Sequence, residues 1–176
     1  MQQLIERLLD LAQVEQRQGL EEQVSIALAA MVEAVLTAQC ARIERAGLQI
    51  EQTIAADVNV FGEPFLLRQA LGNLLENALD FTPQGGTLRF SAHTRHNDVQ
   101  VSLFNQAAPI PDYALPRLSE RFYSLPRPAS GRKSTGLGLN FVEEVMKLHG
   151  GALQIGNVQG GVQVLLHLHT VSTLPT

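Results

Sequence analysis

The stretch from Glu63 to Pro83 constrains the fold more than any other part of the chain. Its sequence is EPFLLRQALGNLLENALDFTP, and its apolar residues recur every three or four positions, which is the spacing of a stripe on a helix. Pro64 suits the first turn of a helix and Pro83 suits its end, because proline has no N–H to donate inside a helix. We therefore predict a helix between these prolines with one face in a core. That face consists of Leu67, Ala70, Leu71, Leu74, Leu75, Ala78 and Leu79.

The same helix carries polar residues that the apolar pattern does not require. Gln69, Asn73 and Asn77 follow one another at intervals of four residues, so their side chains share one helix face. Asparagine has only moderate helix propensity, because its side chain competes for backbone hydrogen bonds. A polar edge exposed to water would explain one asparagine. Two asparagines on one face, with a glycine-rich segment downstream, favour a binding site.

The glycine-rich segment extends from Lys133 to Gly151 and begins KSTGLGL. Gly136 and Gly138 allow the backbone to come close to a ligand. An amphipathic helix is predicted directly after them, and its free N–H groups and positive dipole end suit a phosphate group. One Gly-x-Gly is weak evidence alone, since turns use glycine freely, but the pair of segments is a stronger signal.

A long irregular stretch, Asp112–Thr135, precedes the glycine turn and is rich in Pro, Arg and Ser. Long irregular loops inside compact domains are more often functional than accidental. We interpret this stretch as a lid over a site, and a solvated linker is the alternative. Arg121, Arg132 and Lys133 are candidates to neutralise phosphate charge.

Alternating apolar residues predict strands on both sides of these segments. Strands are expected near residues 24–26, 48–54, 88–93, 99–103, 153–155 and 162–168, with a helix over 29–36 and an extended piece over 55–60. Strands mixed with helices in this order predict an α+β fold, a two-layer sandwich with helices on one face of a mixed sheet.

Together, Asn-x-x-x-Asn and Ser-Thr-Gly-Leu-Gly-Leu resemble the N box and second glycine box of sensor histidine kinases. These kinases belong to the group of ATPases that includes gyrase and the Hsp90 chaperones. The resemblance covers roughly Val58 to His169. It implies the two-layer α/β sandwich of the histidine kinase ATPase (Bergerat) type, with nucleotide between the helix layer and a mobile ATP lid.

The resemblance also implies roles for individual residues, with ATP and Mg²⁺ as cofactors. Asn77 is expected to give an amide oxygen to Mg²⁺, a hard cation that prefers oxygen ligands. Asn73 stands where ATP-hydrolysing relatives place a glutamate base, so the site is expected to hold ATP for transfer, with Asn73 and Asn77 as its catalytic residues. Both asparagines are expected to contact nucleotide. The other expected nucleotide contacts are Asp80, Asn105, Ala107, Pro109, Ile110, Tyr123, Arg132, Lys133, Ser134, Thr135, Gly136, Leu137, Gly138 and Leu139.

One motif of the family is altered. Where the family has the first glycine box, Asp-x-Gly-x-Gly, this chain has Asn105-Gln-Ala-Ala-Pro109. Asn105 can accept a hydrogen bond from adenine, but without the charge of an aspartate. Ala107 adds a methyl group, and Pro109 fixes φ and removes an N–H. We therefore expect impaired nucleotide binding. The alternative is a non-catalytic regulatory module that acts by protein contact; a serine kinase of anti-sigma antagonists shares the fold but fits the lid sequence less well.

The resemblance divides the chain at residue 20. Residues 1–20 are expected to be a remnant of the second helix of the dimerisation and phosphoacceptor domain, and residues 21–176 to be the catalytic and ATP-binding domain. No histidine is followed by an acidic residue, as the family's phosphoacceptor is; the histidines are His93, His96, His149, His167 and His169. The implied partners are the helical phosphoacceptor domain and a cognate response regulator, and the full-length kinase is expected to be a homodimer.

Four segments narrow the resemblance to one bacterial inner-membrane sensor kinase, so we expect a cytoplasmic domain of a membrane protein. They are Asp80, Ile110–Leu115, Arg121–Arg127 and Lys133–Leu139.

Composition excludes several other classes. A net charge of −4 argues against a nucleic-acid-binding surface. With 45% hydrophobic residues but no apolar run that could cross a bilayer, the chain is expected to be soluble and to make no direct membrane contact. Cys40 is the only cysteine, which excludes an internal disulfide, and we interpret it as a core residue. His167 and His169 form a solvent-facing pair in our interpretation, with a metal site as the alternative.

Overall fold

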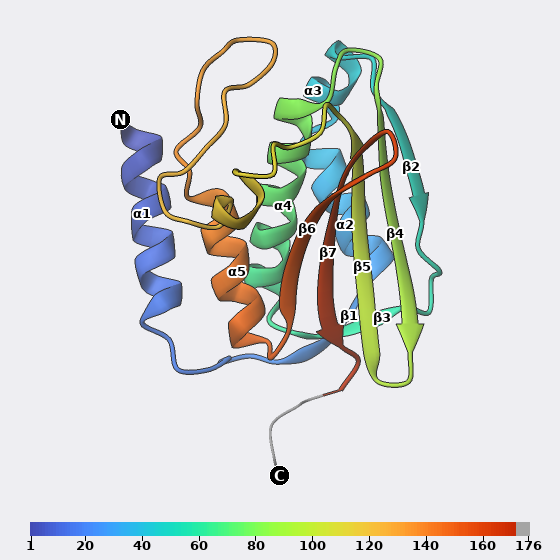
Figure 1. Ribbon diagram of the computed structural model, residues 1–176. Coiled ribbons are helices and arrows are strands. Elements are labelled where there is room, and N and C mark those ends of the chain that lie inside the picture. The colour runs from blue at the N-terminus through green and yellow to red at the C-terminus, as the bar shows by residue number, and fades with distance from the viewer. Residues whose placement is uncertain (172–176) are drawn as a thin grey trace.

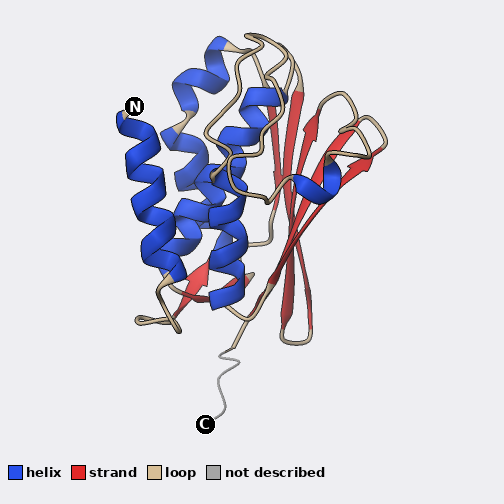
Figure 2. Cartoon of the chain, turned by 60° about the vertical axis from the view of Figure 1, so that its left-hand side comes forward, coloured by secondary structure: helices blue, strands red, loops and turns tan. Residues whose placement is uncertain are grey.

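A five-stranded mixed sheet forms one layer of the molecule and the helices form the other (Figures 1 and 2). The computed structural model describes residues 1–171. The strands lie in the order β2-β4-β5-β7-β6; β2 is parallel to β4, and the other neighbours are antiparallel. The α+β two-layer sandwich expected from the sequence is thereby confirmed. The strand bounds are β2 Gln49–Thr53, β4 Thr87–Arg95, β5 Asp98–Gln106, β6 Ala152–Val158 and β7 Gly161–His169.

The helices cover one face of this sheet. Helices α4 and α5 lie next to each other, and α1 lies beside α5 on the side away from the sheet (Figures 1 and 2). The bounds are α1 Gln2–Glu15, α2 Leu28–Ala38, α3 Cys40–Arg45, α4 Pro64–Phe81 and α5 Gly138–Leu148, with a short 3-10 helix at Leu115–Arg117. Below the helices, β1 (Val24–Ala27) pairs with β3 (Asn59–Gly62) in a separate antiparallel ribbon.

Helix α4 is the central element of the core. It begins at Pro64 and ends at Phe81, shortly before Pro83, as predicted. All seven residues of its predicted apolar face are buried. Leu88 and Phe90 of β4 are fully buried in the same cluster, so the helix and the sheet share one core.

Three details differ from the sequence predictions. The helix after β1 breaks at Gln39, whose φ of −110° and ψ of 11° leave the helical region, and Cys40 begins the separate helix α3. No residue of α3 is buried. The interpretation of Cys40 as a core residue is therefore wrong, because the break turns it toward solvent. The extended piece ends in a true strand, β3, which pairs with β1.

Helix α1 is attached to the rest of the molecule through its C-terminal half and the residues that follow it. Leu11 and Val14 are 2% and 4% exposed and belong to the common core. Beyond the helix, Arg17 forms a two-pronged ion pair with Glu63, with N–O distances of 2.9 and 2.6 Å. Glu63 precedes α4, so this pair joins the chain after α1 to the start of the central helix.

His149 joins the end of α5 to the same place. Its ring is buried; Nδ1 donates to the Val145 carbonyl at 2.7 Å, and Nε2 accepts the Glu63 N–H at 3.1 Å. A neutral ring with its proton on Nδ1 satisfies both bonds. Burial lowers the pKa of His149 below its ordinary value of 6.5, and outweighs the opposing effects of the Val145 carbonyl and the Glu63 carboxylate.

This histidine makes stability depend on pH. Since the unfolded chain binds the proton at a higher pH than the folded chain, the free energy of unfolding should fall as pH drops below about 6.5, and the effect of His149 should end below its folded pKa. We expect His149→Gln to flatten this slope, relative to the unsubstituted chain, by the equivalent of up to about one proton. Urea unfolding at several pH values measures it. A slope in His149→Gln equal to that of the unsubstituted chain would contradict the assignment. Glu63, whose pKa is lowered by Arg17, titrates in a separate window below 4.5.

Candidate functional site

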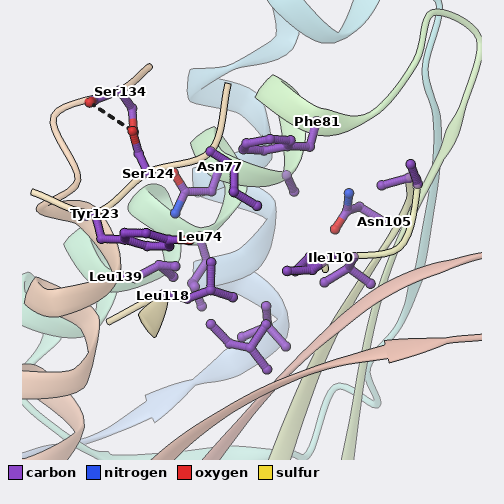
Figure 3. Close-up of a pocket in the computed structure, with 18 of the residues that line it drawn as sticks. Leu74, Asn77, Phe81, Asn105, Ile110, Leu118, Tyr123, Ser124, Ser134 and Leu139 are labelled. Atoms are coloured by element: carbon purple, nitrogen blue, oxygen red, sulfur yellow. Dashed lines mark hydrogen bonds between the residues drawn. The ribbon is translucent and has the colours of Figure 1, made fainter. Parts of the chain in front are cut away.

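A cavity of about 350 Å³ lies between α4, the start of α5, the lid and the end of β5 (Figure 3). Its volume falls in the range of about 300–1,000 Å³ that is common for small-molecule sites. Its walls are largely apolar, and a few polar side chains are placed among them. Apolar side chains from the helix and the sheet line its inner wall, namely Leu74, Ala78, Phe81, Leu103, Ile155, Val162 and Val164.

Most of the predicted nucleotide contacts line this one cavity. They come from four segments that are far apart in the sequence: α4, the residues after β5, the lid and the glycine turn. The predicted residues in its walls are Asn77, Asn105, Ala107, Pro109, Ile110, Tyr123, Ser134, Gly136, Gly138 and Leu139.

Other predicted residues lie outside the cavity walls. Leu137 is 1% exposed and belongs to the core. Asn73 lies on α4 between Gln69, which donates to Asp10 of α1, and Glu76, which pairs with Arg7 of α1. For these residues a nucleotide contact stays a prediction, as it does for Asp80, Arg132, Lys133 and Thr135.

Asn105 marks one end of the cavity. It is 5% exposed, and its side-chain amide points into the cavity from the end of β5 (Figure 3). The chain that follows it is held by Asn157 of β6, whose amide accepts the Ile110 N–H and donates to the Ile110 carbonyl, both at 2.8 Å. This clamp on the residue directly after the altered glycine box was not predicted, because Asn157 and Ile110 are far apart in the sequence.

Asn77 and Gly138 lie at another side of the cavity. A Cβ built on Gly138 would lie 3.8 Å from Asn77 Nδ2. Because glycine has no side chain, the space that such a Cβ would take is left free beside the Asn77 amide. Gly138 is also the first residue of α5, so the free N–H groups of that helix begin here. The arrangement offers an amide oxygen and a helix N-terminus to one ligand group, which suits a phosphate with its bound cation.

Asp80 lies outside the cavity walls and is held by two arginines. Its carboxylate is buried and forms ion pairs with Arg42 of α3 and with Arg127 of the lid, the latter at 2.9 Å. The carboxylate is therefore already occupied, and it does not line the cavity. In this structure Asp80 connects the end of α4 to the lid.

The lid is also connected to the glycine turn and to α1. Phe122 has a φ of 63° and donates its N–H to the Gly136 carbonyl at 3.0 Å. The guanidinium of Arg117 lies 4.3 Å from the centre of the Tyr123 ring, which faces the cavity. Arg121 pairs with Glu15 of α1. These contacts place the lid over the cavity and beside α1.

No group of three or more metal-ligating side chains occurs among the described residues 1–171. His169 is engaged with the Asp98 carboxylate at 2.9 Å and with the Gly150 carbonyl at 3.0 Å. Even with Asp98 beside His169, these residues do not form a group of three that could hold a metal ion within the described part of the chain. Over the same residues, no helix is both long enough and apolar enough to cross a membrane.

Comparison with known proteins agrees with this geometry. The family described as histidine kinase-, DNA gyrase B- and HSP90-like ATPase matches residues 62–172, more than half of the chain. The chain belongs to this family. Within the family it corresponds to the catalytic ATPase domain of sensor histidine kinases, as the resemblance implied.

Two kinds of relatives support this placement within the histidine kinase ATPases. The chain is 45% identical over 170 residues to the sensor protein CreC of Escherichia coli (strain K12), covering 96% of this chain and 35% of CreC. The chain therefore spans about a third of the length of CreC. CreC is also the inner-membrane sensor kinase to which the four sequence segments pointed. The fold matches the catalytic domain of histidine kinase ThkA with a TM-score of 0.77, 22% identity, and coverage of 85% of this chain and 99% of that one. ThkA in complex with the response regulator protein TrrA matches with a TM-score of 0.82 and 19% identity, over 99% of this chain and 49% of that one.

Proposed function

We propose that the chain binds Mg-ATP in this cavity and transfers the γ-phosphoryl group to a histidine on a helical domain outside this sequence. The observation that carries the proposal is the cavity itself, which has a buried amide, Asn105, at one end and Asn77 with Gly138 at another side. A nucleotide needs both of these sets of residues, because its base and its phosphates bind to different partners. The apolar wall between them suits the faces of a purine ring.

Each end has a defined part in this proposal. Asn105 would accept a hydrogen bond from the adenine amino group through its Oδ1. Asn77 Oδ1 would hold Mg²⁺, and the bound cation would neutralise part of the phosphate charge. The N–H groups at the start of α5 would donate to phosphate oxygens. Asn73 has no carboxylate to take a proton from water, so the site would hold ATP for transfer rather than hydrolyse it.

The altered glycine box is proposed to weaken this binding. Asn105 offers an uncharged acceptor where the family uses aspartate, and hydrogen bonds to a charged acceptor are the stronger kind. This alteration also favours a second candidate function, a non-catalytic regulatory module that acts through contact with other proteins. In that case the cavity would keep its shape, but it would not bind nucleotide tightly enough for phosphoryl transfer.

Restoring the acid tests the impairment. We expect Asn105→Asp to raise the affinity for ADP by about fivefold to tenfold, because a charge-assisted hydrogen bond to adenine replaces a neutral one. Guanine nucleotides have no amino group at the same ring position, so GDP affinity serves as the internal control and should not rise. Competition with a fluorescent ADP analogue measures both. An unchanged ADP affinity in Asn105→Asp would argue against impairment at this residue.

The proposed context is a full-length kinase. Residues 1–20, which contain α1, would be the end of the dimerisation and phosphoacceptor domain, and residues 21–176 the catalytic domain. The full-length protein would be a homodimer in the bacterial inner membrane with this domain in the cytoplasm, and it would phosphorylate a CreB-like response regulator. The likeness to CreC and to the catalytic domain of ThkA supports this context.

A further inference from the structure

Arg7 of α1 lies beside the part of the cavity formed by Asn77 and Gly138. A Cβ built on Gly138 would lie 3.6 Å from Arg7 Nη1 and 3.8 Å from Asn77 Nδ2. The guanidinium and the amide therefore border the same small space. Arg7 belongs to a helix outside the matched family segment, which begins at residue 62, so no motif of the site predicts it.

The other edge of the guanidinium is bound to Glu76. Arg7 Nη2 lies 2.7 Å from Glu76 Oε2, and the two side chains are 29% and 33% exposed. Ion pairs this exposed contribute little to stability, so the arginine can exchange its partner at small cost. Nη1 still faces Gly138, and a guanidinium has five donors in a planar fork that suits phosphate.

We propose that Arg7 donates to the terminal phosphate of bound ATP and so lets α1 distinguish ATP from ADP. The inference rests on the proposed binding of Mg-ATP in the cavity. With adenine at Asn105, the phosphates would extend past Asn77 toward α5 and α1, two helices that lie next to each other (Figure 1). ADP lacks the last phosphate in this direction, so Arg7 has less to contact in the ADP complex.

A second contact joins α1 directly to the lid. Glu15, two turns along the same helix, pairs with Arg121 of the lid. A terminal phosphate held by Arg7 would thus lie between the lid and the helix that the lid already contacts. The ATP complex would join α1 to the catalytic domain more tightly than the ADP complex does.

The test uses two variants that break the same ion pair. Arg7→Gln and Glu76→Gln both remove the Arg7–Glu76 pair, so a purely structural role predicts shifts of the same sign. A phosphate contact predicts opposite signs. We expect Arg7→Gln to weaken Mg-ATP binding by about fivefold to tenfold with less than about twofold change for Mg-ADP. Glu76→Gln should strengthen Mg-ATP binding, because it removes a competing anion, and Arg7→Lys should retain part of the wild-type ATP preference because it keeps the charge.

Calorimetric titration of each variant with Mg-ATP and Mg-ADP gives the readout, and urea unfolding checks that each variant is folded. Shifts of the same sign in Arg7→Gln and Glu76→Gln, or equal losses for ATP and ADP in Arg7→Gln, overturn the inference alone. A wild-type chain that binds neither nucleotide overturns the proposed function itself. The two failures are therefore distinguishable.

Discussion

Asn77→Ala is expected to lower Mg-ATP affinity by at least about tenfold while leaving the fold intact. The loss follows because alanine removes the proposed magnesium ligand, and the remaining phosphate contacts cannot replace an oxygen of the metal shell. The fold should tolerate the change, since Asn77 is only half-buried and alanine has the higher helix propensity. A thermal-shift titration with ATP, with and without Mg²⁺, measures both effects.

Gln69→Ala is the matched control for this variant. Gln69 lies on the same face of α4 and donates to Asp10 at 2.9 Å, away from the cavity walls. It should change nucleotide affinity by less than about twofold, since it removes only a partly exposed hydrogen bond. If Asn77→Ala retains a magnesium-dependent shift equal to that of Gln69→Ala, Asn77 is not the metal ligand.

Gly136→Ala is expected to detach the lid from the glycine turn. Gly136 has a φ of 70°, a conformation that costs an alanine about 1–2 kcal/mol. Its new Cβ would also lie about 2.4 Å from the backbone carbon of Phe122, so one of the two segments must move. We expect a local loss of about 2 kcal/mol or more at this contact, and at least a tenfold loss of nucleotide affinity.

Gly138→Ala is the matched control, because it also adds a methyl group near the glycine turn but causes no steric clash. A Cβ there meets its nearest neighbours at 3.6 Å or more, which is ordinary contact, so stability should change by less than about 0.5 kcal/mol. Hydrogen exchange at the Phe122 amide, which donates to the Gly136 carbonyl, should accelerate in Gly136→Ala and not in Gly138→Ala. Equal exchange in the two variants would contradict the proposed strain at Gly136.

The sequence predicted the elements with strong periodicity and the motifs on them. Helix α4 was predictable because its apolar residues repeat at helical spacing between two prolines, and β4 and β5 because their apolar residues alternate. The break at Gln39 was not, since the apolar pattern of α2 gives no stop signal there and the chain turns by tertiary context. That break is why Cys40 was misplaced.

The cavity was predictable in part. The two motifs indicated Asn77, Gly136 and Gly138, and the structure brings all three to one cavity. The long-range partners were not predictable, because nothing in a local pattern indicates which charges meet. The Asn157 clamp, the Asp80–Arg127 pair and the place of Arg7 are contacts of this kind.

The most direct test of the central claim is calorimetric titration of the 176-residue chain with ADP and ATP, with and without Mg²⁺. Binding of both nucleotides, with ATP affinity raised by Mg²⁺, is the predicted result and supports a kinase domain that tolerates its altered glycine box. Absence of both heat and thermal stabilisation at millimolar nucleotide would contradict the claim. The cavity would then belong to a regulatory module that keeps the kinase fold without its ligand.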